Sequence, residues 1–149
     1  MKVDTLHEGS ITRQATGRLV IPTRGPGFTD ITDLVAPWVA HLAVREGLLV
    51  AFCRHTSASL TIQENADPDV RRDLLSALDR LAPRDAPYVH DMEGPDDMPA
   101  HIRAMLTGAG LAVPIVGGKL GLGTWQGLYL VEHRDGAHRR EILLHLSGG

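Results

Sequence analysis

The 149-residue sequence has little cysteine, no long apolar run and no excess of positive charge, and each shortage excludes a class of protein. Its one cysteine, Cys53, has no partner in the chain, which excludes an intrachain disulfide framework and favours a reducing compartment. The longest uninterrupted apolar run, Leu48 to Cys53, is too short to span a bilayer, and the N-terminus carries no visible secretion signal. We therefore expect a cytoplasmic protein without a membrane anchor.

The charge balance excludes a general nucleic-acid-binding protein. Fifteen Lys and Arg residues stand against 18 Asp and Glu, for a formal charge of −3, so no overall positive field is available to hold a polyanion. With 43% hydrophobic and 22% charged residues, the composition is that of an ordinary globular protein, and the length predicts a single domain over residues 1–149. Eight histidines are the unusual feature, because packing alone does not require so many metal ligands and proton carriers.

The apolar pattern predicts strands interleaved with three helices and followed by a run of strands. The predicted strands are two short ones in 10–22 that meet at a turn near Gly17, then 48–54, 58–64, 111–116, 123–133 and 140–146. The predicted helices run from Leu34 to Gly47, from Pro68, after an Asp67 cap, to just before Pro83, and from about Pro99 to Thr107. The unbroken apolar character of 48–54 predicts burial on both faces. This order is typical of a compact α+β fold with mixed or antiparallel, sandwich-like sheets.

Three histidines are expected at element ends or in a loop, where side chains face a surface cleft. His55 follows the strand 48–54, His90 lies in the aperiodic segment 83–99, and His101 falls in the first turn of the third helix. Three imidazole nitrogens can hold a divalent ion, zinc or magnesium, and nearby carboxylates can add oxygens. The carboxylate candidates are Glu64, Asp91, Glu93, Asp96 and Asp97. Simple solvation of these histidines is the alternative, since their spacing matches no compact metal motif.

Two of these acids have a second interpretation. Asp96 and Asp97 precede Pro99, at the start of the third predicted helix, where a carboxylate caps free backbone N–H groups and complements the helix dipole. Capping explains at least one acid without a ligand. A magnesium ion bound to a phosphorylated substrate would use the same carboxylates, so both interpretations stay open.

Several other side chains are candidates for substrate contact. The segment 121–127 is rich in glycine but does not open a helix after a strand, so it is neither a phosphate-binding loop nor a dinucleotide fingerprint. Trp125 in this segment can stack on a flat heterocycle or fill the core, and the basic residues can neutralise phosphate or remain solvated. The candidates are Thr56, Ser57, Lys119, Trp125, Gln126, Arg139 and Arg140.

Five ordered motifs carry a family resemblance across nearly the whole chain. They are His55-Thr56-Ser57-Ala58-Ser59-Leu60-Thr61, Glu64-Asn65-Ala66-Asp67-Pro68, Tyr88-Val89-His90-Asp91, Asp96-Asp97-Met98-Pro99-Ala100-His101 and Gly123-Thr124-Trp125-Gln126. In this order and spacing the sequence resembles the YjbQ-like secondary thiamine-phosphate synthase family. The resemblance implies a single α+β domain, a homotrimer, a metal-binding pocket and small phosphorylated substrates.

The implied reaction joins a pyrimidine carrying a diphosphate to a thiazole phosphate and releases diphosphate. Such a transfer needs a stabilised leaving group and no covalent nucleophile, so a divalent metal ion and cationic side chains would contribute most of the catalysis. The resulting hypothesis assigns the metal to His55, His90 and His101, ligand orientation or proton transfer to Asp91 or Glu64, and phosphate to Arg139, Arg140 or Lys119. Two other classes stay open: a metal-dependent hydrolase of a phosphorylated metabolite, and a non-catalytic oligomeric protein that binds a small ligand or metal.

Overall fold

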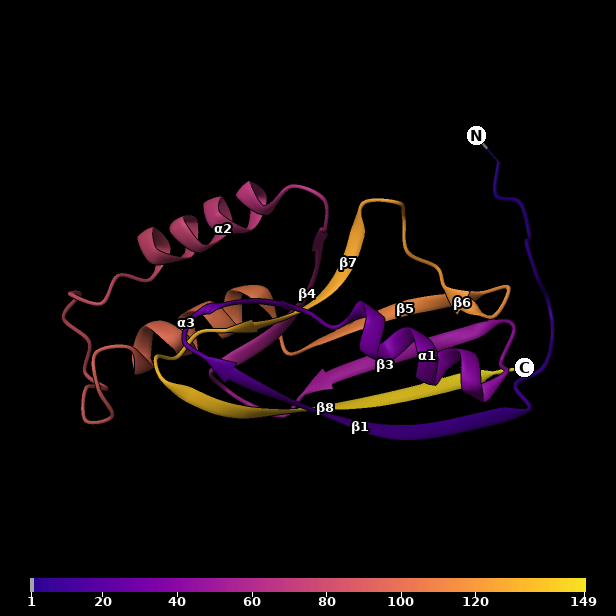
Figure 1. Cartoon of the computed structure of the whole chain (residues 1–149), viewed down its shortest axis with the longest axis horizontal. Helices are drawn as coiled ribbons and strands as arrows, with labels where there is room; N and C mark the ends of the chain where they lie inside the picture. Colours follow the sequence, from indigo (N-terminus) through magenta and orange to yellow (C-terminus); the bar gives the residue numbers. More distant parts are fainter. Residues whose placement is uncertain (1) are drawn as a thin grey trace.

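The computed structural model describes residues 2–149, which form three helices and eight strands in two antiparallel sheets (Figure 1). The strands are β1 (Arg13–Arg24), β2 (Gly27–Asp30), β3 (Gly47–Cys53), β4 (Ala58–Glu64), β5 (Gly110–Val116), β6 (Lys119–Leu120), β7 (Gln126–Glu132) and β8 (Ala137–Gly148). The helices are α1 (Thr32–Leu42), α2 (Pro68–Leu81) and α3 (Asp97–Thr107). One sheet has the order β1-β8-β3-β5-β6 and the other the order β2-β7-β4. The predicted α+β class is confirmed.

The hydrophobic core is shared by the five-stranded sheet, the three-stranded sheet and α1. Alternate residues of β3 and β8, such as Leu49 and Leu146, point inward and are fully buried, as the two-residue period of a strand requires. Helix α1 adds Val35 and Val39, four residues apart on one helical face. Truncation of a leucine at such a position typically costs about 2–5 kcal/mol, so this core fixes the strands from which the loops start.

Strand β3 differs from the prediction of burial on both faces. Leu49, Ala51 and Cys53 are buried, but Leu48, Val50 and Phe52 on the other face are 42%, 38% and 49% exposed. An unbroken apolar run therefore lies in a sheet with only one face covered by its own chain. The outer face of β3 and Val116 of β5, which is 47% exposed, form an apolar surface that we call the outer sheet face.

Two glycines that the sequence pattern placed at a turn and at a helix end serve close packing instead. Gly17 lies inside the continuous strand β1, and a Cβ there would come within 3.0 Å of the Trp38 ring. Helix α1 ends at Leu42, with Ala43 in the left-handed conformation, and Gly47 begins β3. A Cβ on Gly47 would lie 2.3 Å from the Ser147 carbonyl oxygen. The predicted two short strands and the helix to Gly47 were wrong because tertiary contacts, not local turns, require these glycines.

The remaining helices agree more closely with the sequence. Helix α2 begins at Pro68, and the Asp67 carboxylate accepts a hydrogen bond from the Asp69 amide at 2.9 Å, as predicted for a cap. Helix α3 begins at Asp97, two residues before the predicted start. No helix within residues 2–149 is long and apolar enough to cross a membrane.

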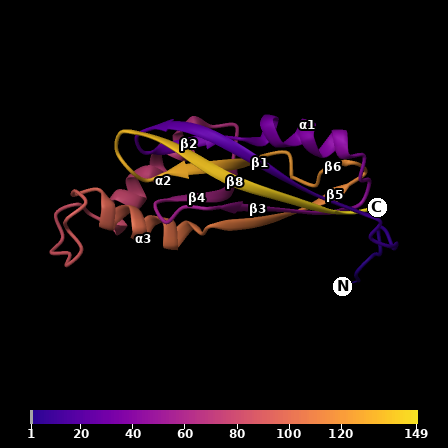
Figure 2. The same cartoon turned by 90° about the horizontal axis from the view of Figure 1, so that it is seen from below.

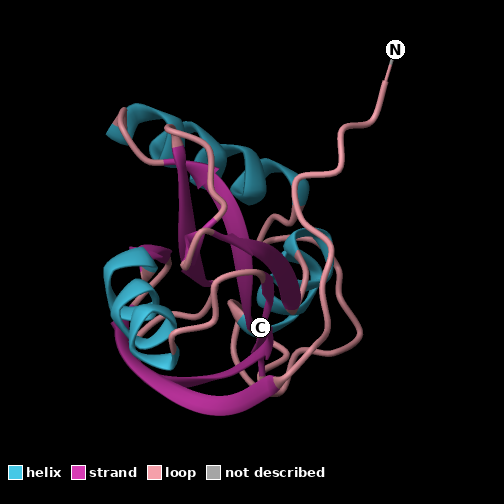
Figure 3. Cartoon of the chain, turned by 90° about the vertical axis from the view of Figure 1, so that its right-hand side faces the viewer, coloured by secondary structure: helices cyan, strands magenta, loops and turns pink. Residues whose placement is uncertain are grey.

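The helices divide the molecule into two ends. Helix α3 and the loop after α2 lie at one end, while α1, β6 and both chain termini lie toward the other (Figures 1 and 2). Seen along the long axis, the helices stand around the strands and do not form one bundle (Figure 3). Residues at the α3 end are therefore far from residues near α1 and β6 in the same chain (Figure 1).

Candidate metal centre

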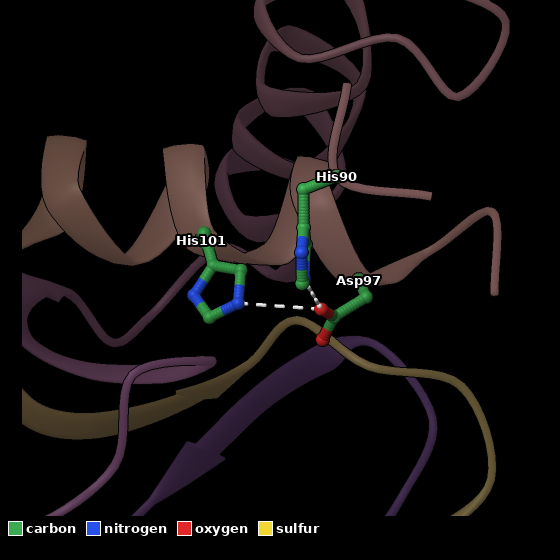
Figure 4. A group of neighbouring side chains, drawn as sticks. All are labelled: His90, Asp97 and His101. Atoms are coloured by element: carbon green, nitrogen blue, oxygen red, sulfur yellow. Dashed lines mark hydrogen bonds and ion pairs between the residues drawn. The ribbon is translucent and has the colours of Figure 1, made fainter. Parts of the chain in front are cut away.

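Two of the predicted metal ligands meet at the α3 end around a buried carboxylate. His90 comes from the loop between α2 and α3, and Asp97 and His101 lie four residues apart on one face of α3 (Figure 4). Nε2 of His90 is 2.7 Å, and Nε2 of His101 is 3.3 Å, from Oδ2 of Asp97. Among residues 2–149, these three form the one group of three or more His, Cys, Asp or Glu residues whose ligand atoms all lie within 4.8 Å of one another.

The orientation of the His101 ring shows what the cluster requires. Nδ1 of His101 lies 3.1 Å from the Thr56 carbonyl oxygen, which only accepts hydrogen bonds, so Nδ1 carries a proton. Nε2 of the neutral ring then presents a lone pair to Oδ2 of Asp97, which places two acceptors in contact. A cation resolves this contact, either as a second proton on the imidazole or as a metal ion bound to both atoms. A ligand histidine oriented by a carbonyl at its other nitrogen is the usual arrangement in metal sites.

An arginine that follows β7 holds the carboxylate in place. Arg134 donates from Nη1 to Oδ1 of Asp97, from Nε to Oδ2 of Asp96 at 2.7 Å, and from Nη2 to the Glu93 carbonyl at 3.1 Å. Oδ1 is thereby occupied, and Oδ2 is left for the two histidines. Burial alone raises the pKa of Asp97, but the hydrogen bond from His90 and the charge of Arg134 outweigh it, so this pKa lies below its ordinary value.

The same contacts decide the question of helix capping. Asp96 occupies the N-cap position of α3, but its side chain makes no capping hydrogen bond. Its Oδ2 accepts instead from Arg134 and, at 2.9 Å, from the Asp135 amide. The capping interpretation is therefore wrong for the side chain of Asp96, because a charged guanidinium is the stronger partner.

His55 lies outside the group of neighbouring ligand atoms. Its Nε2 accepts a hydrogen bond from the Glu141 amide at 2.8 Å, so that nitrogen is occupied and the proton sits on Nδ1. Burial and the nearby Arg140 charge lower the pKa of His55, which favours the neutral ring. His55 and His101 line the same pocket of about 280 Å³, whose other walls come from Thr56, Ala58, Ala104, Met105 and Ala109.

The remaining residues predicted at this end have different surroundings. Asp91 is exposed beside His90 in the loop, and Arg139 is exposed on β8. Arg140 is buried, and its guanidinium binds the Glu132 carboxylate and donates to Oγ of Ser57 at 3.1 Å. The positive charge of Arg140 is therefore paired with Glu132 inside the protein.

Three predicted residues, Glu64, Trp125 and Gln126, lie at the opposite end of the three-stranded sheet, and Lys119 lies on β6 of the other sheet. Glu64 pairs with Gln126 at one end of the β4–β7 ladder, and Ala58 pairs with Glu132 at the other. Six steps along a strand cover about 20 Å, so Glu64 and Gln126 do not reach the histidines of the same chain. Trp125, beside Gln126, is 63% exposed, so the core-filling interpretation of this ring is wrong. Lys119 and Gln126 line a separate pocket of about 690 Å³ against α1.

The sequence reasoning missed the role of Arg134 and gave Asp97 no special place among the acids. The spacing of Asp97 and His101 was the available signal, because residues four apart share a helical face. No comparable signal exists for Arg134, which lies 37 positions after Asp97 and reaches it only through the fold.

A comparison with known protein families gives the chain its place. The pattern of the family described as UPF0047 protein YjbQ-like matches residues 18–149. The chain belongs to this family. A UPF0047 protein of Synechocystis sp. is 51% identical over 137 residues, which cover 91% of this chain and 93% of the relative. The UPF0047 protein YjbQ of Salmonella typhimurium is 46% identical over 123 residues, which cover 82% of this chain and 89% of the relative.

Solved YjbQ-like structures share the fold. The crystal structure of an uncharacterized conserved protein of the YjbQ/UPF0047 family from Clostridium acetobutylicum superposes with a TM-score of 0.79 at 44% sequence identity. The match covers 85% of this chain and 96% of that one. Family and fold are thereby established.

Proposed function

We propose that this protein is a metal-dependent enzyme that acts on small phosphorylated molecules, with His90, Asp97 and His101 as the metal ligands. The observation that carries the proposal is the convergence of Nε2 of His90 and Nε2 of His101 on Oδ2 of Asp97, which places three ligand atoms within 4.8 Å of one another. Two imidazole nitrogens and one carboxylate oxygen are a donor set of catalytic zinc sites, so we propose zinc in preference to magnesium.

The proposed reaction is that of a secondary thiamine-phosphate synthase. It is supported by the resemblance of the five sequence motifs, including those that contain His101 and Gln126, to that family. A pyrimidine diphosphate is joined to a thiazole phosphate, the bond from the pyrimidine's methylene carbon to the diphosphate oxygen breaks, and the thiazole nitrogen bonds to that carbon. A bound divalent ion would neutralise charge on the departing diphosphate. Asp91, which is exposed and follows His90 in the sequence, is proposed to orient the ligands or move a proton.

The residues around the cluster have separate tasks in this proposal. Arg134 keeps Asp97 ionised and fixed, and the Thr56 carbonyl orients His101. The pocket beside His101 has small apolar walls, which suit a flat ring, and His55 lines it with a neutral imidazole. We propose that His55 contacts substrate through its Nδ1–H, since its Nε2 is occupied.

Assembly into a homotrimer would place Lys119, Trp125 and Gln126 of one subunit near the histidines of another. Gln126 lies at the end of the β4–β7 ladder away from the histidines of its own chain. Trp125 precedes it in the sequence, and Lys119 lines the same pocket as Gln126, so we propose that a neighbouring subunit supplies all three. The outer sheet face supports association, because four large apolar side chains there are between 38% and 49% exposed. A trimer in the cytoplasm is therefore part of the proposal.

The test measures zinc content and turnover in the same preparations. The wild-type chain should bind one zinc ion per subunit and form thiamine phosphate from the two substrates. The double variant His90→Ala, His101→Ala should lose both properties. His41→Ala, on the exposed side of α1, is the matched control and should retain them.

Each other result has a defined meaning. Zinc retention by the double variant would overturn the metal centre. A metal-binding chain without synthase turnover would overturn the synthase reaction alone. Profiling of phosphorylated metabolites with added divalent ions would then separate a hydrolase from a non-catalytic binding protein.

A further inference from the structure

A buried arginine faces a second pocket, on the side of α3 away from the metal centre. Arg103 follows Asp97 by six residues, which turns it about 240° around the helix axis. Its residue is only 3% exposed. It lines a pocket of about 430 Å³ between α2, α3 and the turn before β2, together with Pro26, Leu75, Asp79, Pro83 and Arg84.

The guanidinium of Arg103 is incompletely paired. Nη2 donates to the Ala82 carbonyl at 2.9 Å and lies 2.9 Å from Oδ1 of Asp79. Within residues 2–149, Nε of Arg103 is the one buried side-chain nitrogen or oxygen without a hydrogen-bond partner. An unpaired donor on a buried cation is costly, so this nitrogen requires an explanation.

The edge of the guanidinium that holds Nε and Nη2 can bind a carboxylate or phosphate group through two parallel hydrogen bonds. Asp79 uses only one of these two donors, and its side chain is 69% exposed. Because the Asp79 carboxylate stays largely in solvent while it contacts Arg103, its departure needs little change in its own hydration, and Asp79 is a displaceable partner. Arg84, which lines the same pocket, adds a second cation but is paired with Asp135.

We propose that this pocket binds a small organic anion, whose carboxylate or phosphate group displaces Asp79 from Nη2 of Arg103 and, once Asp79 has moved, reaches the buried Nε as its second donor. Pro26, Leu75 and Pro83 give the pocket apolar walls, which suit an apolar body attached to the anionic group. The site is separate from the metal centre, and its occupation does not depend on the proposed synthase reaction.

The experiment titrates the full-length protein with benzoate and, in parallel, with inorganic phosphate. Saturable binding of either probe is expected, and the tighter one identifies the chemical source of the anion. Asp79→Asn removes the competing carboxylate and should tighten binding at least tenfold. Asp73→Asn removes the same charge from an exposed position on α2 that does not line the pocket, and should change binding less than twofold.

Two further variants locate the binding. Arg103→Lys keeps the charge but loses the two-donor edge, so binding should weaken at least tenfold in the folded protein. His41→Ala, on the exposed side of α1, should leave binding of both probes unchanged. The proposal is overturned if neither probe binds wild type or Asp79→Asn, if Asp79→Asn and Asp73→Asn bind equally, or if Arg103→Lys binds both probes as tightly as wild type.

Discussion

Two buried carboxylates, Glu132 and Asp97, are equally inaccessible yet have opposite surroundings. Each is 2% exposed. Glu132 accepts from Arg140, from Oγ1 of Thr23 at 2.6 Å and from two backbone amides, and its partners are enclosed in the protein. Asp97 shares one oxygen between His90 and His101, whose side chains are 45% and 34% exposed.

The difference separates a structural ion pair from a chemical site. Both carboxylates have a lowered pKa, and in both the pairing outweighs a burial effect that raises it. A perturbed pKa therefore does not distinguish them. What distinguishes Asp97 is that one of its oxygens, Oδ2, contacts two imidazoles with access to solvent, whereas both oxygens of Glu132 are bonded to an arginine that keeps its charge.

Breaking the enclosed pair should have the largest effect on stability. Glu132→Gln leaves Arg140 buried beside a neutral partner, and we expect a loss of about 3–5 kcal/mol in the free energy of unfolding, measured with denaturant. Zinc affinity of the folded variant should change less than threefold. Glu8→Gln, at an exposed position, is the control and should match wild type. A large loss of zinc affinity in the folded Glu132→Gln variant would contradict the distinction between the two carboxylates.

A histidine next to Glu132 should give the enclosed region a pH dependence. Burial lowers the pKa of His133 to about 4 from an ordinary value of 6.5. Between these values the unfolded chain holds the proton and the folded chain does not, so stability falls as pH decreases through that window, by up to about 3 kcal/mol. Denaturant unfolding at pH 7 and pH 4.5 measures the change.

The variant His133→Gln isolates this contribution. Glutamine does not titrate, so the dependence of stability on pH between 6.5 and 4 should become flatter than in wild type. His41→Gln, at an exposed position, should keep the wild-type slope. An unchanged slope in His133→Gln would assign the effect to other histidines.

Breaking the open cluster should affect metal binding more than folding. Asp97→Asn removes the ligand charge, and we expect zinc affinity to fall about 100-fold, measured by competition with a chelating dye. Its loss of unfolding free energy should be smaller than that of Glu132→Gln. If Asp97→Asn binds zinc like wild type, the cluster is structural like the enclosed one.

The smallest effect is expected from the arginine that positions Asp97. Arg134→Gln should weaken zinc binding about tenfold, because an outer partner of the ligand is lost. Without this cation the pKa of Asp97 rises, so zinc should also be released at a higher pH than in wild type. Arg134→Lys should recover part of both properties. An affinity and a release pH unchanged in Arg134→Gln would show that Asp97 is held by the helix alone.

Local features of the fold were predictable because neighbours in the sequence create them. Asp67 and Pro68 predict the start of α2, and the four-residue spacing puts Asp97 and His101 on one helical face. The exposure of one face of β3 was not predictable, since the same apolar run occurs in strands that are covered on one face and in strands that are covered on both. Gly17 and Gly47 resemble turn residues until Trp38 and Ser147 are seen beside them.

By itself, the sequence determined the α+β class, the number of helices within residues 2–149 and the start of α2, since these follow from periodicity and local backbone preference. Only the tertiary structure decided which acid joins His90 and His101. It brings Arg134 to Asp97 and engages Nε2 of His55 with the Glu141 amide. It also places Glu64 of β4 and Gln126 of β7 at the end of their ladder about 20 Å from the Ala58–Glu132 pair. Convergence of distant segments depends on the packing of the whole chain, and no local pattern encodes it.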